Sequence, residues 1–227
     1  MIQDMEILQN IKQLPKYEKE MFKVWKANGL ISVGAMNKLF ETDADREGLA
    51  RWKANYDLKH GEGACDRYMA ECCRRGTLLH ENIEAKLYNQ PLPHSDEVLG
   101  KYAKMQKNYF SKFLNKVDPI YLEKIMCNEE LRLTGIVDCI GYYDGVLSII
   151  DFKFSSKPKD EAYITDYRRQ VAAYALIVYK ETGVLIKQCV IAVGNEKDNE
   201  CQVFKYPTSP MVKGLVVNLK NINYFAK

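Results

Sequence analysis

The sequence lacks an apolar run that approaches the length of a transmembrane helix, and its N-terminus, MIQDMEILQN, lacks a signal-peptide pattern. Its cysteines number seven, an odd count, and they are scattered along the chain. That usage argues against a disulfide framework and fits a reducing compartment. These absences predict a cytoplasmic protein, or a nuclear one in a eukaryotic cell, with no targeting signal and no membrane partner.

A tight group of metal-binding cysteines is also missing. Cys72 and Cys73 are adjacent on a predicted helix, so their side chains point in different directions and make a poor metal pair. A large excess of charge of one sign is also missing, because the formal net charge is only +3 at pH 7. We therefore expect no zinc site, and the overall charge does not identify a class of partner.

The 227 residues, 47% hydrophobic and 28% charged, have the composition of an ordinary globular protein. The length suits one large domain or a domain with an extension. Helical patterns dominate residues 1–117, and residues 118–227 read as β-β-β-α-β-β followed by a final helix. The pattern predicts an α/β protein in which a helical section, residues 1–117, and a core, residues 118–227, form one compact unit.

The chain is organised around the segment LRLTGIVDCIGYYDGVLSIIDFKF, residues 131–154. It predicts two strands joined at Asp144 and Gly145, because Asp-Gly between apolar, β-branched runs is a strong hairpin signal. With these two as the loop residues, the register places Asp138 directly opposite Asp151. Opposed side chains have Cβ atoms roughly 4.5–5.5 Å apart, where like charges are destabilising, so we expect a divalent cation between them.

Lys153 adds a third polar group to this face, because it lies two residues beyond Asp151 on the same strand. Two carboxylates and an ammonium among apolar residues such as Ile140 and Ile149 are not what a core would select. One interpretation is a metal-dependent reaction centre. The other is a surface hairpin with an ion pair from Lys153 to either aspartate, and the spacing alone leaves both open.

Four segments resemble motifs of the RecB-type nucleases in the PD-(D/E)XK superfamily. GIVD at 135–138, IDFK at 150–153 and QVAAY at 170–174 resemble the D…DxK…QxxxY pattern, and RGTLLHENIE at 75–84 resembles the GTxxHxxxE helix of the same group. All four occur in the order found in the family, which is far more specific than any one motif. Val137 stands where the superfamily's name would put proline, as is common in this branch.

The resemblance implies a restriction-endonuclease-like core, a mixed central sheet flanked by helices, that hydrolyses phosphodiester bonds with a divalent metal. The implied metal is Mg²⁺ or Mn²⁺, held by His80, Asp138, Asp151 and the backbone carbonyl of Phe152. Lys153 would orient the attacking water or stabilise the transition state as a fixed positive charge. The two aspartates and this lysine are therefore the central catalytic residues of the prediction.

The resemblance also assigns supporting roles. Gln170 and Tyr174 are i, i+4 neighbours on a predicted helix, and in the family they orient the substrate backbone or the catalytic lysine. Glu84, four residues after His80, and Glu123, on the first predicted strand, are further acids that could belong to the site. Some members hold an iron–sulfur cluster with a tight cysteine group near the C-terminus, but no such group occurs here and we expect no cluster.

Basic residues interleaved with aromatic ones suit single-stranded nucleic acid, where lysines follow phosphates and rings stack on bases. A third long helix, predicted for residues 95–117, carries lysines beside Tyr102, Tyr109 and Phe113. The alternative, which we favour for the aromatics, places these rings in the core and leaves the role of the lysines open. The predicted nucleic-acid-binding residues are Lys101, Lys104, Lys157 and Arg169.

A long helical section without a recognisable helicase or specificity domain resembles the stand-alone DNA exonucleases of the mitochondrial and phage type. The sequence therefore predicts an exonuclease that prefers single-stranded ends, acts in DNA replication, recombination or repair, and has replication or recombination proteins as partners. One alternative is a catalytically silent nucleic-acid-binding module, although such relatives usually lose an aspartate or the lysine. The other is a structure- or sequence-specific endonuclease, which the lack of a separate recognition domain disfavours.

Overall fold

The computed structural model describes residues 2–226, and their side chains from Met5 onward. The N-terminal part consists of α1 (Ile2–Ile11), α2 (Met21–Ala27), β1 (Ile31–Ser32), α3 (Val33–Met36), η1 (Asn37–Phe40), α4 (Asp43–His60), α5 (Ala64–Leu87), α6 (Asp96–Leu99), η2 (Gly100–Tyr102), α7 (Ala103–Lys112) and η3 (Leu114–Lys116). The remainder consists of β2 (Val117–Asn128), β3 (Leu133–Tyr143), β4 (Val146–Ser155), η4 (Glu161–Tyr163), α8 (Thr165–Thr182), β5 (Gln188–Asn195), β6 (Glu200–Pro207), α9 (Thr208–Asn221) and η5 (Tyr224–Ala226).

The strands form one mixed sheet in the order β1-β3-β4-β5-β6, with β2 also paired to β3. Strands β2, β3 and β4 are antiparallel in turn, β4 and β5 run parallel, and β6 returns antiparallel to β5. A parallel pair needs a crossover connection, and α8 supplies it between β4 and β5. The predicted α/β class, a mixed sheet flanked by helices after an N-terminal helical section, is confirmed. The division at residue 117 stays a prediction, and β1 from the N-terminal part pairs with the sheet.

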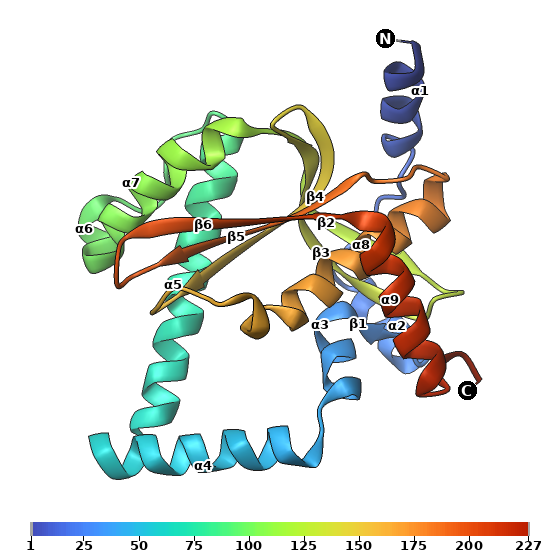
Figure 1. The fold of residues 1–227 in the computed structure, drawn as a ribbon. Coiled ribbons are helices and arrows are strands. Elements are labelled where there is room, and N and C mark those ends of the chain that lie inside the picture. Colours follow the sequence, from blue (N-terminus) through green and yellow to red (C-terminus); the bar gives the residue numbers. More distant parts are fainter. Residues whose placement is uncertain (1, 227) are drawn as a thin grey trace.

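Helices cover both faces of the sheet (Figure 1). Residues of α1, α3, α8 and α9 pack on one face with Ile149 of β4, while residues of α5 and α7 pack on the other with Ile150 and Phe152. Successive strand residues point to opposite faces, so Asp151 and Lys153 lie on the face that α8 covers. Strand β4 therefore lies between α5 on one face of the sheet and α8 on the other.

The hairpin has the predicted turn and register. Asp144 and Gly145 have φ angles of +49° and +75°, as a two-residue type I′ turn requires. The ladder between β3 and β4 follows the register that this turn imposes and ends at Cys139 opposite Ile150. The predicted pair of Asp138 and Asp151 would come next in this register but is not part of the ladder, because the Asp138 side chain accepts the Phe152 N–H there. The apolar alternation of the two strands and the Asp-Gly turn therefore predict the same register.

The single helix predicted for residues 95–117 is wrong. Gly100, with φ 54° and ψ −119°, breaks the segment into α6, η2, α7 and η3. Glycine adopts such a conformation without the steric cost that a side chain would add. The aromatic rings of Tyr102, Tyr109 and Phe113 are almost fully buried, which confirms the favoured interpretation that they belong to the core.

Helix α4 is unlike the other long helices, because all its residues are described and none of them is buried. It begins with a capping box in which the Thr42 side chain accepts from the Asp45 N–H and the Asp45 side chain accepts from the Thr42 N–H. Leu49 and Trp52 are 53% and 40% exposed. Figure 1 shows α4 lying apart from the sheet, joined to it through α3 and α5.

Candidate active site

The candidate site lies at one edge of β3, in an opening between two strands that share this edge. Strand β2 pairs with β3 along residues 133–143 and takes up the other edge. Strand β4 pairs with residues 139–143, and β1 with residues 133 and 134. Residues 135–138, the GIVD motif, therefore face the opening.

Side chains bind the backbone groups of β4 that border the opening. The Phe152 N–H donates to Asp138 Oδ2 at 2.8 Å, and His80 Nε2 lies 3.0 Å from the Phe152 carbonyl oxygen. These side chains come from different elements, His80 from α5 and Asp138 from β3. The structure thus brings together three of the groups that the sequence implied for a metal site.

Glu123 approaches the same place from β2. The register of β2 and β3 places it opposite Asp138, between paired residues on either side. Its φ of +47° is uncommon for a residue other than glycine. Strained backbone of this kind persists only where the surroundings hold it, and it clusters at functional sites. The sequence left Glu123 open because neither the strained backbone nor the long-range strand register can be read from it.

The ligand atoms of His80, Glu123 and Asp138 all lie within 4.8 Å of one another. Glu123 Oε1 is 3.6 Å from His80 Nδ1. Burial alone would lower the pKa of His80, but the carboxylates of Glu123 and Asp138 outweigh it and the pKa is raised. One imidazole and two carboxylates that converge in this way can bind a single divalent cation.

Asp151 lies next to this cluster, and its hydrogen bonding tests whether the residues of the site fit a cation. Its side chain is 3% exposed, and Oδ1 accepts a hydrogen bond from Lys153 Nζ at 2.6 Å. Oδ2 is buried and has no hydrogen-bond partner within residues 2–226. Burial raises the pKa of this carboxyl to about 7, an effect that Lys153 opposes and Asp138 reinforces. A buried oxygen without a partner is costly, and a cation beside it would remove that cost, so the residues fit the implied metal.

Lys153 is held between the two aspartates, because its Nζ also lies 4.0 Å from Asp138 Oδ2. Burial alone would lower the pKa of Lys153, but Asp151 and Asp138 outweigh it and the pKa is raised, which keeps the group an ammonium. The ring of Tyr167, on α8, lies 5.4 Å from this nitrogen. Sequence reasoning missed Tyr167, although its place three residues before Gln170 puts both on one side of α8.

Tyr174 approaches the opening from α8. Burial, with the charges of Asp138 and Asp151, raises the pKa of Tyr174 well above its usual value, although a hydrogen bond with Gln170 acts the other way. A Cβ at Gly135 would lie only 2.6 Å from the Tyr174 hydroxyl oxygen. Glycine at the start of the GIVD motif therefore makes room for this ring.

The sequence matches the profile of the PD-(D/E)XK nuclease superfamily over residues 47–210. The chain belongs to this superfamily. The matched region contains the cluster of His80, Glu123 and Asp138, together with α8.

Three known proteins are similar to part of this chain. The chain is 32% identical to mitochondrial genome maintenance exonuclease 1 of Homo sapiens over 154 residues, which cover 66% of this chain and 44% of the relative. It is 30% identical to the Mus musculus protein of the same name over 156 residues, covering 66% and 45%. It is also 32% identical over 68 residues to one component of an ATP-dependent helicase/nuclease of Clostridium beijerinckii, covering 29% and 6%. The chain thus spans less than half the length of these relatives.

A solved structure has the same fold. It is the crystal structure of a protein from Eubacterium rectale, provisionally described as an exonuclease, with a TM-score of 0.50 and 13% identity. The superposition covers 93% of this chain and 86% of that one. At this identity the likeness concerns the fold alone.

Glu84 lines the same cleft as His80 and Glu123, a cavity of about 640 Å³ beside α5. Burial raises the pKa of Glu84, and the charge of Glu123 adds to this. Glu84 lies outside the three-residue cluster found in the described part of the chain. Its role in metal binding stays a prediction.

The four residues predicted to bind nucleic acid come from separate parts of the fold. Lys101 forms an ion pair with Glu196 at 3.0 Å, and Arg169 is also held in an ion pair with a neighbouring aspartate. Lys104 on α7 and Lys157 after β4 are exposed. Contacts of all four with DNA stay predictions.

Proposed function

We propose that this chain is a metal-dependent deoxyribonuclease that hydrolyses phosphodiester bonds from DNA ends, with a preference for single-stranded ends. The observation that carries the proposal is the convergence of His80, Glu123 and Asp138 beside β3, with Lys153 between Asp138 and Asp151. The names of the similar mitochondrial proteins support an exonuclease. The activity is a proposal because the chain spans less than half of those proteins.

The proposed metal is Mg²⁺ or Mn²⁺. The groups that would hold it are His80, Asp138, Asp151 and the Phe152 carbonyl, as the sequence implied, together with Glu123. An imidazole ligand shifts the preference somewhat towards Mn²⁺. When bound, the cation would neutralise charge that develops on the phosphoryl oxygens.

Residues of the chain itself supply the remaining functions. Lys153 would act as a fixed positive charge beside the reacting phosphate, and its contacts with Asp151 and Tyr167 hold it in place before substrate arrives. Gln170 and Tyr174 lie on the same helix as Tyr167 and would orient the substrate backbone or the lysine. A charge already in position costs no reorganisation during the reaction.

Aromatic side chains on α4 and α5 support the preference for single strands. Trp52, Tyr56, His60 and Tyr68 form a chain of ring contacts with centroids 4.5–6.3 Å apart. Tyr68 also donates to Ser156 Oγ at 3.2 Å, which places the rings beside the loop after β4. Because α4 buries none of its residues, its rings are free of the core and can stack on unpaired bases.

A role in DNA replication, recombination or repair extends the proposal to a process, and genome maintenance in the name of the human relative supports it. Replication or recombination proteins as partners stay a prediction. No helix within residues 2–226 is long and apolar enough to cross a membrane. The cytoplasmic compartment is likewise a prediction, and the human relative is named as mitochondrial.

The proposal is tested with oligonucleotides labelled separately at each end, single- and double-stranded, incubated with Mg²⁺, Mn²⁺ or EDTA. Metal-dependent release of mononucleotides or a ladder, lost in Asp151→Asn, is the expected result and also gives the polarity. Internal cuts in a circular substrate would replace the exonuclease by an endonuclease. Binding without cleavage under either metal would favour a silent nucleic-acid-binding module.

A further inference from the structure

Helix α5 contacts β4 at two carbonyl groups, and only one of them belongs to the site described above. His80 Nε2 lies 3.0 Å from the carbonyl oxygen of Phe152. Five residues earlier on α5, Arg75 Nη2 donates to the carbonyl oxygen of Phe154 at 3.2 Å. Residues two apart on a strand direct their carbonyls to the same side, so both contacts lie along the border where β3 no longer pairs with β4.

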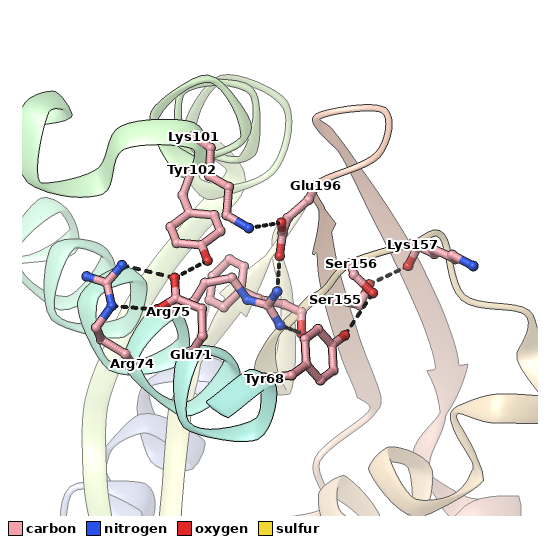
Figure 2. Close-up of polar contacts among 11 residues, drawn as sticks. Tyr68, Glu71, Arg74, Arg75, Lys101, Tyr102, Ser155, Ser156, Lys157 and Glu196 are labelled. Carbon is pink, nitrogen blue, oxygen red and sulfur yellow. Dashed lines mark hydrogen bonds and ion pairs between the residues drawn. The ribbon is translucent and has the colours of Figure 1, made fainter. Parts of the chain in front are cut away.

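The second contact is anchored by a buried ion pair. Arg75 is 4% exposed, and its Nη1 forms a salt bridge with Glu196, which follows β5. The backbone N–H of Glu196 donates to the Ser155 carbonyl at 3.0 Å, so the acid is itself fixed to the end of β4. Its second carboxylate oxygen binds Lys101 Nζ at 3.0 Å. Figure 2 shows Arg75 pointing from α5 toward Glu196 and the end of β4, with Lys101 on the other side of the acid.

The arrangement serves geometry more than stability. A buried ion pair contributes little net stability relative to apolar packing, because both charges lose their hydration. Arg75 Nε is buried without a hydrogen-bond partner among the described residues, so the guanidinium is not satisfied in full. Its planar fork does fix Nη1 on Glu196 and Nη2 on the Phe154 carbonyl at a set angle, which a lysine could not do.

We propose that Arg75 is a positioning residue that sets α5 on β4 and thereby places His80 at the Phe152 carbonyl. The five-residue step from Arg75 to His80 spans about 7.5 Å of rigid helix, so a shift at one end is carried to the other. Arg75 acts through His80 and not by contact with substrate or metal. The inference rests on the proposed function for His80 as a metal ligand and for the activity readout, and a Mn²⁺ titration tests the first of these without any cleavage.

The test measures Mn²⁺ affinity by calorimetry for the wild type, Arg75→Gln, Arg75→Lys, Glu196→Gln and Arg74→Gln, with thermal unfolding of each variant. Arg74 is the matched control, because it is the next residue on α5 but lies at the surface and pairs with Glu71 at 2.8 Å. Loss of a residue that orients a ligand weakens metal binding by roughly 10–100-fold, and we expect this for Arg75→Gln. Arg74→Gln should bind Mn²⁺ as the wild type does.

If Arg75→Gln does not fold, the milder variants Arg75→Lys and Glu196→Gln test the proposal instead. Both should fold and bind Mn²⁺ more weakly than the wild type, and Arg75→Lys should lower kcat for DNA more than it changes KM. Folded variants that bind Mn²⁺ with wild-type affinity would overturn the proposal. If the wild type binds Mn²⁺ but cleaves no DNA, the proposed function fails while the Mn²⁺ affinities still decide the role of Arg75. A wild type that binds no Mn²⁺ would overturn both.

Discussion

Lys153 Nζ lies 2.6 Å from one oxygen of Asp151, while the other oxygen of that carboxylate is buried without a hydrogen-bond partner in the described part of the chain. One carboxylate therefore has two distinct sides. The first holds the ammonium in place, and the second is the oxygen that we propose as a metal ligand beside the cluster of His80, Glu123 and Asp138. In that proposal, one side chain serves both charge stabilisation and metal binding.

Replacing Lys153 by alanine should lower kcat by about 10²–10³-fold and leave DNA affinity nearly unchanged, because a fixed charge of this kind acts mainly in the transition state. Single-turnover cleavage and fluorescence anisotropy of a labelled oligonucleotide measure the two quantities. Lys157→Ala is the control, since an exposed lysine at the end of β4 should affect binding more than turnover. A matching loss of binding and turnover in Lys153→Ala would contradict this role.

Mn²⁺ affinity should fall as the pH falls through the raised pKa of Asp151, about 7. Protons compete with the cation for the Asp151 carboxyl and for the His80 imidazole, whose pKa is also raised, so the affinity should drop about tenfold or more per pH unit below these values and level off above them. Calorimetry across neutral pH measures this dependence. An affinity that does not change across this range would show that Asp151 is not a ligand.

In the metal-free protein the pH dependence should have the opposite sign, because Asp151 should make the free energy of unfolding decrease as the pH rises. A carboxyl whose pKa is raised by folding stabilises the fold when protonated. Its contribution is complete below the ordinary pKa of an aspartate and is lost as the pH rises through the raised value of Asp151. Thermal unfolding in EDTA should therefore show a smaller decline with rising pH in Asp151→Asn than in the wild type.

Glu123→Gln should weaken Mn²⁺ binding about tenfold or more, because it removes one charged oxygen ligand from the cluster. Glu84→Gln is a matched control, since it makes the same change in the same cleft outside the cluster. Its affinity should stay within about threefold of the wild type. Equal losses in both variants would assign the effect to the overall charge of the cleft.

Gly135→Ala should destabilise the protein by about 1–3 kcal/mol, because the added Cβ would lie 2.6 Å from the Tyr174 hydroxyl oxygen. Tyr174→Phe removes that oxygen. The double variant should therefore lose less stability than the sum of the two single ones, as chemical denaturation can measure. Additive losses would mean that β3 moves instead of the ring.

Trp52→Ala should weaken binding of single-stranded DNA by about 1–3 kcal/mol if its ring stacks on a base. Leu58→Ala on the same helix is the control, because Leu58 is 88% exposed and belongs to none of the ring contacts. Binding of a short duplex should change little in either variant. An equal effect of Trp52→Ala on both substrates would remove the link to single strands.

Local chemistry explains what the sequence predicted. The Asp-Gly turn fixes the register of β3 and β4 as far as Cys139 and Ile150, and alternation along β4 then puts Asp151 and Lys153 on one face. Asp138 lies one residue beyond the last paired residue of β3, and its Oδ2 is 4.0 Å from Lys153 Nζ. The ends of α5 and α8 follow from Pro91 and Gly183, which limit a helix locally.

Long-range pairing explains what the sequence did not predict. The place of Glu123 depends on a β-bulge in β2, since the register with β3 shifts between Pro119 and Tyr121. The opening itself exists because β1, only two residues long, pairs with β3 at a distance from β4. The salt bridge of Arg75 with Glu196 joins residues 121 positions apart, which no local pattern indicates.

The exposure of helix α4 decides which part of the molecule should unfold first. This helix buries none of its residues and is held by its own backbone hydrogen bonds, its two ends and a few side-chain contacts, such as those of Trp52 and Tyr56 with Tyr68. Its amide hydrogens should exchange with solvent through local unfolding, long before those of the sheet, and a protease should cut residues 43–60 first. The segment that carries Trp52 can therefore unfold and refold while the side chains of the candidate site keep their places.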